Sequence, residues 1–140
     1  MLTERWVFRA IPEAAAEARR AAWQLGERLG LDGSSLSAIV LCVNEAVSNV
    51  VTHAYRHQRE PGHVELEARV PAGTLCVSVR DRGGGLAPRD DSPGAGFGLG
   101  VIASLAGRVS VREVRPTGTE LVMSFPVEEE ARRSGAPAPR

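Results

Sequence analysis

Two runs of alternating apolar and polar residues, joined by a short turn, place the strongest constraint on how this chain can fold. Apolar side chains occupy every second position in residues 63–70 (HVELEARV) and again in residues 74–81 (TLCVSVRD). The alternation predicts two strands with one buried face each, and the intervening Pro-Ala-Gly predicts a tight hairpin. Because a hairpin pairs its strands antiparallel, a purely parallel sheet is excluded.

The other predicted elements lie on both sides of this hairpin. Alternation predicts three more strands, over residues 4–10, 108–114 and 119–127. Composition and apolar spacing predict three helices, over residues 12–29, about 36–54 and about 97–105. The fold class that follows is an α/β (α+β) two-layer sandwich, in which a mixed, mostly antiparallel sheet has helices on one face.

A single domain is expected from the length and the pattern. The chain has 140 residues, which matches the usual size of one domain. All patterned elements fall within residues 1–127, which are predicted to form that domain. Residues 128–140 offer no core positions and are predicted to be a disordered tail.

Composition narrows the function classes. All 17 basic residues are arginine, and 17 acidic residues bring the formal net charge to zero. The lack of lysine excludes a P-loop ATPase and a Schiff-base enzyme, and the charge balance gives no sign of nucleic-acid binding. No segment approaches a membrane span and the N-terminus does not resemble a signal peptide, so a cytoplasmic protein is expected. Cys42 and Cys76 lie in apolar runs and are predicted to be reduced core thiols.

The second predicted helix carries an unusual polar pair. Within residues 41–55 (LCVNEAVSNVVTHAY), Glu45 and Asn49 are four positions apart and therefore share one helix face. The apolar stripe is offset from them, so the pair is expected to flank the core. A glutamate can act as a general base, and an asparagine carbonyl oxygen can ligate Mg²⁺. The solvent side of an amphipathic helix explains the same spacing.

A carboxylate ends the second strand of the hairpin. Asp81 continues the parity of Leu75, Val77 and Val79, which places it on the covered face, where it needs a hydrogen-bond donor. The exocyclic amino group of a purine is such a donor, and the glycines of residues 83–85 would let a ligand approach closely. The alternative is a strand-ending aspartate followed by a flexible turn.

Two later segments complete the candidate set. Residues 94–100 (GAGFGLG) lead into the third helix, and free N–H groups at a helix start can bind phosphate; a flexible loop is the alternative. Thr119 shares the strand parity of Leu121, so its hydroxyl is expected on the covered side, where a ligand or Asp81 could bond it. An ordinary hairpin threonine is the other interpretation.

In this order and spacing, the segments resemble the GHKL, or Bergerat-fold, ATPases over about residues 4–127. The matching motifs are Glu45-x-x-x-Asn49 for the N box, residues 81–85 (DRGGG) for the D-x-G-x-G box, residues 96–100 (GFGLG) for the glycine box, and Gly118-Thr119 for the final G-T pair. The stretch from Asn44 to Tyr55 is most similar to stand-alone bacterial anti-sigma-factor serine/threonine kinases. The resemblance implies the Bergerat ATP-binding fold.

The resemblance also implies a role for each motif. Glu45 would be the catalytic general base, Asn49 the ligand of Mg²⁺, and Asp81 the acceptor of the adenine amino hydrogen, supported by Thr119. Gly83 and Gly85 would let the base lie against the chain. The backbone around four further residues would cap the phosphates: Gly96, Gly98, Leu99 and Gly100. Residues 86–95 would form a lid, in which Arg89 could reach a phosphate, while His53 and Tyr55 are expected to pack or cap the helix.

The implied function is that of an ATP- and Mg²⁺-dependent serine/threonine protein kinase and anti-sigma factor. Such a protein sequesters a sigma factor and phosphorylates an anti-anti-sigma protein of the STAS type. A homodimer is a further expectation, since residues 4–10 would leave a free sheet edge; direct binding to nucleic acid or membrane is not expected. The alternatives are an ATP-gated binding module without significant kinase activity, and a structural protein that binds no nucleotide.

Overall fold

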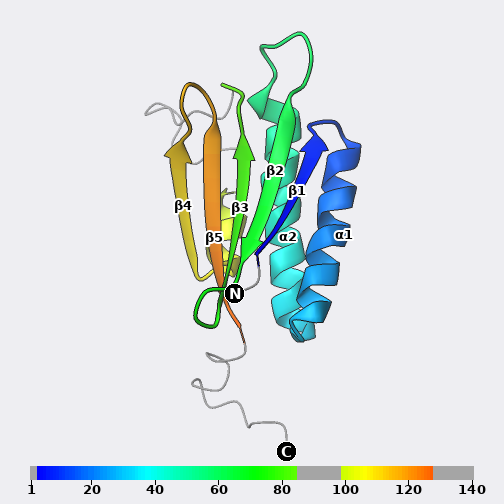
Figure 1. The fold of residues 1–140 in the computed structure, drawn as a ribbon, viewed down its shortest axis with the longest axis vertical. Helices are drawn as coiled ribbons and strands as arrows, with labels where there is room; N and C mark the ends of the chain where they lie inside the picture. The colour runs from blue at the N-terminus through cyan, green and yellow to red at the C-terminus, as the bar shows by residue number, and fades with distance from the viewer. Residues whose placement is uncertain (1–2, 85–98, 128–140) are drawn as a thin grey trace, which may run out of the picture.

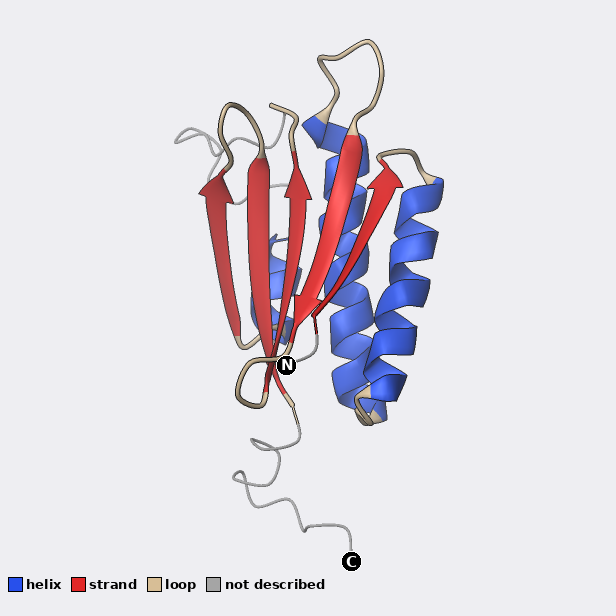
Figure 2. Ribbon diagram, in the orientation of Figure 1, coloured by secondary structure: helices blue, strands red, loops and turns tan. Residues whose placement is uncertain are grey.

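A five-stranded sheet carries three helices on one face in the computed structural model, which describes residues 3–84 and 99–127 (Figure 1). The elements in chain order are β1 (Thr3–Arg9), α1 (Glu13–Arg28), α2 (Gly33–Asn49), η1 (Val50–Ala54), β2 (His63–Arg69), β3 (Thr74–Asp81), α3 (Leu99–Leu105), β4 (Arg108–Glu113) and β5 (Thr119–Pro126). The predicted two-layer sandwich is confirmed, and Figure 2 shows the sheet in front with helices behind it and to its right.

The strand order in the sheet is β1-β2-β3-β5-β4. All four pairings of neighbouring strands are antiparallel, so the expected mixture with parallel strands is absent from the described part of the chain. The predicted hairpin forms from β2 and β3, and β4 and β5 form a second one. The second hairpin docks through β5, which places β5 beside β3 and leaves β1 and β4 as the edges.

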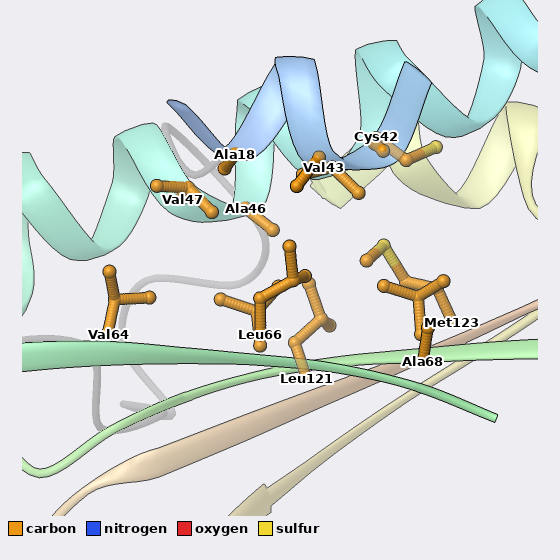
Figure 3. Packing of buried hydrophobic residues seen from close by; sticks show 14 of the residues in the cluster. Ala18, Cys42, Val43, Ala46, Val47, Val64, Leu66, Ala68, Leu121 and Met123 are labelled. Carbon is orange, nitrogen blue, oxygen red and sulfur yellow. The ribbon is translucent and has the colours of Figure 1, made fainter. Parts of the chain in front are cut away.

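The core lies between the helices and the covered face of the sheet. Figure 3 shows valine and alanine side chains of α2 pointing toward the alternate residues of β2 and β5. These buried positions follow the period of two in the strands and of three to four in the helix. The residues in this view include Val43, Ala46 and Val47 of α2, Val64, Leu66 and Ala68 of β2, and Leu121 and Met123 of β5.

The second helix begins earlier than the sequence predicts. It starts at Gly33 rather than near Leu36, because Asp32 caps it: the Asp32 carboxylate accepts the Ser35 N–H at 2.8 Å. The preceding helix ends as expected, with Gly30 at φ +68°. The helix α2 continues after Asn49 as η1, a π-helix. π-Helical turns are often found near functional sites.

Together α2 and η1 form one 22-residue helix, Gly33–Ala54, that is long and apolar enough to cross a membrane by length and hydropathy alone. This differs from the expectation that no segment approaches a span. The buried side of this helix packs against α1 and the sheet. Core helices of water-soluble domains pass the same test, so the observation is weak evidence for a membrane span.

The opposite face of the sheet is uncovered by helices and mostly polar. Glu120 of β5 is 4% exposed on this face and forms ion pairs with Arg80 of β3 and Arg112 of β4, its direct cross-strand neighbours. These contacts join three strands. Cys76 also lies on this face and is half-buried, whereas Cys42 is fully buried. The prediction of two core thiols is therefore correct for Cys42 and wrong for Cys76.

Candidate nucleotide site

Asp81 and Thr119 lie opposite each other at one end of the sheet. They are register partners in the β3–β5 pairing, and Val64 of β2 flanks Asp81 on its other side. Asp81 is 1% exposed and Thr119 is 7% exposed. Both side chains therefore lie on the covered face, as their strand parity predicts.

Burial dominates the electrostatics of Asp81. Removal from water raises the pKa of its carboxyl from 3.8 to about 6, while hydrogen bonds from the backbone N–H groups of Gly83 and Thr119 act to lower it. The Gly83 nitrogen lies 2.9 Å from Asp81 Oδ1. None of the ion pairs among the described residues includes Asp81. The charge is thus stabilised by neutral donors alone.

This environment fits a ligand that donates hydrogen bonds. An ionised carboxylate has about four acceptor sites, and two backbone N–H groups leave some of them available. A further neutral donor would offset part of the cost of burying the charge. The amino group of adenine has this chemistry, so the residues present fit the base of an adenine nucleotide.

Two glycines allow the backbone to pass very close to the Asp81 segment. A Cβ on Gly83 would lie 2.0 Å from the Ala54 carbonyl oxygen, and a Cβ on Gly118 would lie 2.2 Å from the Asp81 carbonyl oxygen. Gly118 also has φ +137°, a conformation that favours glycine. The sequence predicts that Gly83 makes room for a base. Its close approach to Ala54 is a second reason why this position requires glycine.

Glu45, the predicted general base, and Asn49, the predicted Mg²⁺ ligand, both lie on α2. Both are half-buried, and Cys42 precedes them on the same helix face at spacings of three and seven. The Cys42 sulfur lies 4.0 Å from the Ile102 carbonyl oxygen of α3, so this face of α2 borders α3. The pair flanks the core as expected, and the apolar stripe of α2 faces the sheet.

A Mg²⁺ ion bound by Asn49 would need oxygen ligands beyond those of the protein. Among the described residues, no group of three or more histidine, cysteine, aspartate or glutamate side chains could hold a metal ion. Mg²⁺ is commonly held by one or two protein oxygens together with substrate phosphates. Asn49, the predicted ligand, fits that mode of binding.

The predicted phosphate-binding segment, residues 96–100, is described only in part. Leu99 is half-buried and packs on the core as the first residue of α3, and Gly100 is exposed. Gly85, Gly96 and Gly98 lie outside the described residues, as do the predicted lid of residues 86–95 with Arg89 and the predicted tail of residues 128–140. Leu99 and Gly100 begin α3, which borders α2 through the contact between Ile102 and Cys42.

One contact at the site is missing from the sequence-based account. The Tyr55 hydroxyl, at the end of η1, donates to the His63 carbonyl oxygen at 2.5 Å and accepts the Arg82 N–H at 3.0 Å. Tyr55 is expected only to pack or cap. It is the only tyrosine in the chain, and a buried tyrosine hydroxyl usually has a partner, which is the signal that could have revealed the contact.

Comparison with known proteins agrees with this geometry. Residues 8–125 match the family profile of the histidine kinase-like ATPase domain. The chain belongs to the histidine kinase-like ATPase family. Membership of this ATPase family implies that the domain binds ATP, in agreement with the resemblance drawn from the four motifs.

Relatives of this histidine kinase-like ATPase domain include two sensor proteins. The chain is 32% identical over 111 residues to the sensor histidine kinase PdtaS of Mycobacterium tuberculosis, covering 74% of this chain and 22% of that protein. It is 30% identical over 128 residues to the alginate biosynthesis sensor protein KinB of Pseudomonas aeruginosa, covering 79% of this chain and 21% of that protein. The chain thus spans about a fifth of each of these relatives.

A solved structure has the same fold. The crystal structure of the RsbU and RsbW domains of Rv1364c from Mycobacterium tuberculosis matches with a TM-score of 0.72 and 22% sequence identity. The match covers 90% of this chain and 32% of that one. At this identity the likeness concerns the fold, and it confirms the α+β arrangement of a histidine kinase-like ATPase domain.

Proposed function

We propose that this domain is an ATP- and Mg²⁺-dependent serine/threonine protein kinase that also acts as an anti-sigma factor. It would sequester a sigma factor and phosphorylate an anti-anti-sigma protein of the STAS type. The observation that supports this most is the placement of Glu45 and Asn49 on the face of α2 that borders α3. A domain with that fold in the neighbouring structure carries the name RsbW, which favours a regulatory kinase over a sensor kinase.

Each residue in this proposal has a task suited to its surroundings. The Asp81 carboxylate accepts a hydrogen bond from the adenine amino group, and Thr119 lies directly opposite it. The Asn49 amide oxygen offers a neutral ligand to the metal. Glu45 takes the proton of the attacking serine or threonine hydroxyl. When bound, ATP would supply the γ-phosphoryl group and leave as ADP, and Mg²⁺ would neutralise the charge that develops on the phosphates.

The ATP-gated binding module remains the alternative function. The same fold and the same nucleotide contacts support it, because holding ATP requires Asp81 and Asn49 but not a general base. The two functions therefore differ in what they require of Glu45.

Replacing Glu45 with glutamine separates these functions. We expect Glu45→Gln to slow phosphoryl transfer by about 10²–10⁴-fold, the usual contribution of a general base, with ATP affinity nearly unchanged. The measurement is transfer of labelled γ-phosphate to a purified STAS-type protein from the same genome. Asn44→Ala is the matched control, because Asn44 precedes Glu45 but contacts Arg19 of α1 instead.

Transfer at the wild-type rate by Glu45→Gln would remove Glu45 from the chemistry. No transfer by the wild-type protein, together with normal ATP binding, would favour the binding module. If Mg-ATP gives no thermal shift at all, the domain is not a nucleotide-binding protein; a ligand at 100 times its Kd should add about 2.7 kcal/mol of stability.

The raised pKa of Asp81 predicts a pH dependence of base binding. The ionised carboxylate accepts the adenine amino hydrogen, and below pH 6 an increasing fraction of Asp81 is protonated. We therefore expect the affinity for adenosine to fall about tenfold between pH 7 and pH 5. Adenosine is the probe because the terminal phosphate of ATP titrates in the same range. A flat profile measured by calorimetry would argue against recognition by Asp81.

A further inference from the structure

Tyr55 joins two parts of the site that are distant in sequence. Tyr55 follows η1, the turn that extends the helix bearing Glu45 and Asn49, and the residue is 7% exposed. Its hydroxyl accepts the N–H of Arg82, the residue directly after Asp81, at 3.0 Å. Burial raises the pKa of Tyr55, so the hydroxyl keeps its proton and donates it to the His63 carbonyl oxygen.

The ring of Tyr55 packs against Gly62. A Cβ on Gly62 would lie 2.5 Å from the ring, so only glycine leaves room for the ring in this position. The Gly62 carbonyl oxygen in turn accepts the Ala10 N–H at 2.8 Å. The hydroxyl therefore reaches Arg82 and His63 from a fixed ring, which makes the contact a property of the packed domain and not of a mobile side chain.

A second hydrogen bond joins the same two segments. The Gly84 N–H donates to the Ala54 carbonyl oxygen at 3.0 Å, and Gly83 sits against the same carbonyl. Two consecutive residues at the end of η1, Ala54 and Tyr55, thus bind three consecutive residues after Asp81. The helix that carries Glu45 and Asn49 is fastened here to the strand end that carries Asp81.

We propose that Tyr55 is a positioning residue that sets the spacing between the base-recognition end of the site at Asp81 and the phosphate end at Asn49. The inference rests on the nucleotide site of the proposed function and on its assignment of Asp81 and Asn49. A ligand that spans both ends depends on their spacing, whereas a ligand that occupies one end does not. Tyr55 itself touches neither the base nor the phosphates in this scheme.

The test compares ATP, which spans the site, with adenosine, which occupies only the Asp81 end. Tyr55→Phe keeps the ring and removes both hydrogen bonds, so the core remains filled. We expect calorimetry to show ATP affinity reduced about tenfold, which is the effect of about 1.4 kcal/mol, and adenosine affinity changed less than twofold. Thr117→Val is the matched control. Thr117 lies in the turn between β4 and β5, and its hydroxyl donates to the Arg82 carbonyl oxygen at 3.1 Å. Removing this hydrogen bond should leave ATP affinity within twofold.

Hydrogen exchange of the segment that contains Arg82 and Gly84 gives an independent readout in nucleotide-free protein. We expect faster exchange in Tyr55→Phe than in the wild type. Unchanged ATP affinity in Tyr55→Phe, or an equal loss for ATP and adenosine, would overturn the positioning role, and so would unchanged exchange. If the wild type itself binds no ATP, the proposed function fails first, and the inference fails with it.

Discussion

Replacing Asp81 with asparagine is expected to abolish measurable ATP binding and, in nucleotide-free protein at pH 7, to raise the melting temperature. Both effects follow from one buried carboxylate that is stabilised only by backbone N–H groups. Asparagine can still accept those N–H groups through its amide oxygen, and it carries no charge to desolvate. Its amide nitrogen, however, would present a donor where the adenine amino group also brings a donor.

The sign and size of the stability effect follow from the pKa of Asp81. The unfolded carboxyl ionises near 3.8 and the folded one near 6, so folding takes up a proton between these values. The folded state therefore loses stability relative to the unfolded state as pH rises through this window, and the full penalty is present above pH 6. The gain from Asp81→Asn should be about 1–3 kcal/mol at pH 7 and vanish near pH 4.

Scanning calorimetry with and without Mg-ATP would measure both effects. Asp32→Asn is the matched control, since Asp32 is an exposed helix cap at which asparagine caps equally well. That variant should change neither ATP binding nor the melting temperature appreciably. Wild-type ATP affinity in Asp81→Asn would mean that a different group recognises the base.

The second large effect is expected at Gly83. A Cβ at this position would lie 2.0 Å from the Ala54 carbonyl oxygen, a backbone atom that cannot rotate away. We expect Gly83→Ala to lower the free energy of unfolding by about 2 kcal/mol or more. We also expect it to weaken ATP binding strongly, because the Asp81 segment must move away from η1.

Gly84→Ala is the matched control for this substitution. Nothing lies within 4 Å of a Cβ placed on Gly84, and the N–H that bonds the Ala54 carbonyl is retained. Urea denaturation should therefore show a change within about 0.5 kcal/mol for Gly84→Ala. Equal stability of the two variants would show that the close approach of Gly83 to Ala54 is not maintained in solution.

Most of the fold could be predicted because its signals are local. Alternation at every second residue predicts each strand end to within one residue, and the hairpin of β2 and β3 follows from its short turn. The early start of α2 differs from the predicted start near Leu36, because Asp32, a standard cap residue, begins the helix at Gly33. The position of β5 beside β3 was not predicted, since a hairpin can dock through either of its strands.

Strand parity also determines which side chains of β3 and β5 lie on each face of the sheet. Cys76 alternates with the apolar residues of β3, so its position on the uncovered face was already implied by the parity that placed Asp81 on the covered one. Burial of Asp81 opposite Thr119 followed directly from that rule. The same rule placed Glu120 on the uncovered face, but its two arginine partners depend on strand order.

The contacts that fasten the site together could not be predicted from local signals. The ties from Tyr55 to Arg82 and from Ala54 to Gly84 join residues far apart in the sequence. They also depend on the π-turn after Asn49, for which residues 50–54 give no recognisable pattern. Glu45 and Asn49 were identifiable by spacing, whereas what holds them relative to Asp81 required the three-dimensional structure.

Calorimetric titration of the wild-type protein with ATP, in the presence of Mg²⁺ and again with EDTA, tests the central claim most directly. We expect saturable binding of one ATP per chain, clearly weaker when the metal is removed because Asn49 then has no ion to hold. Absence of binding in both buffers would contradict the assignment of Asp81, Asn49 and the glycine segments to a nucleotide site.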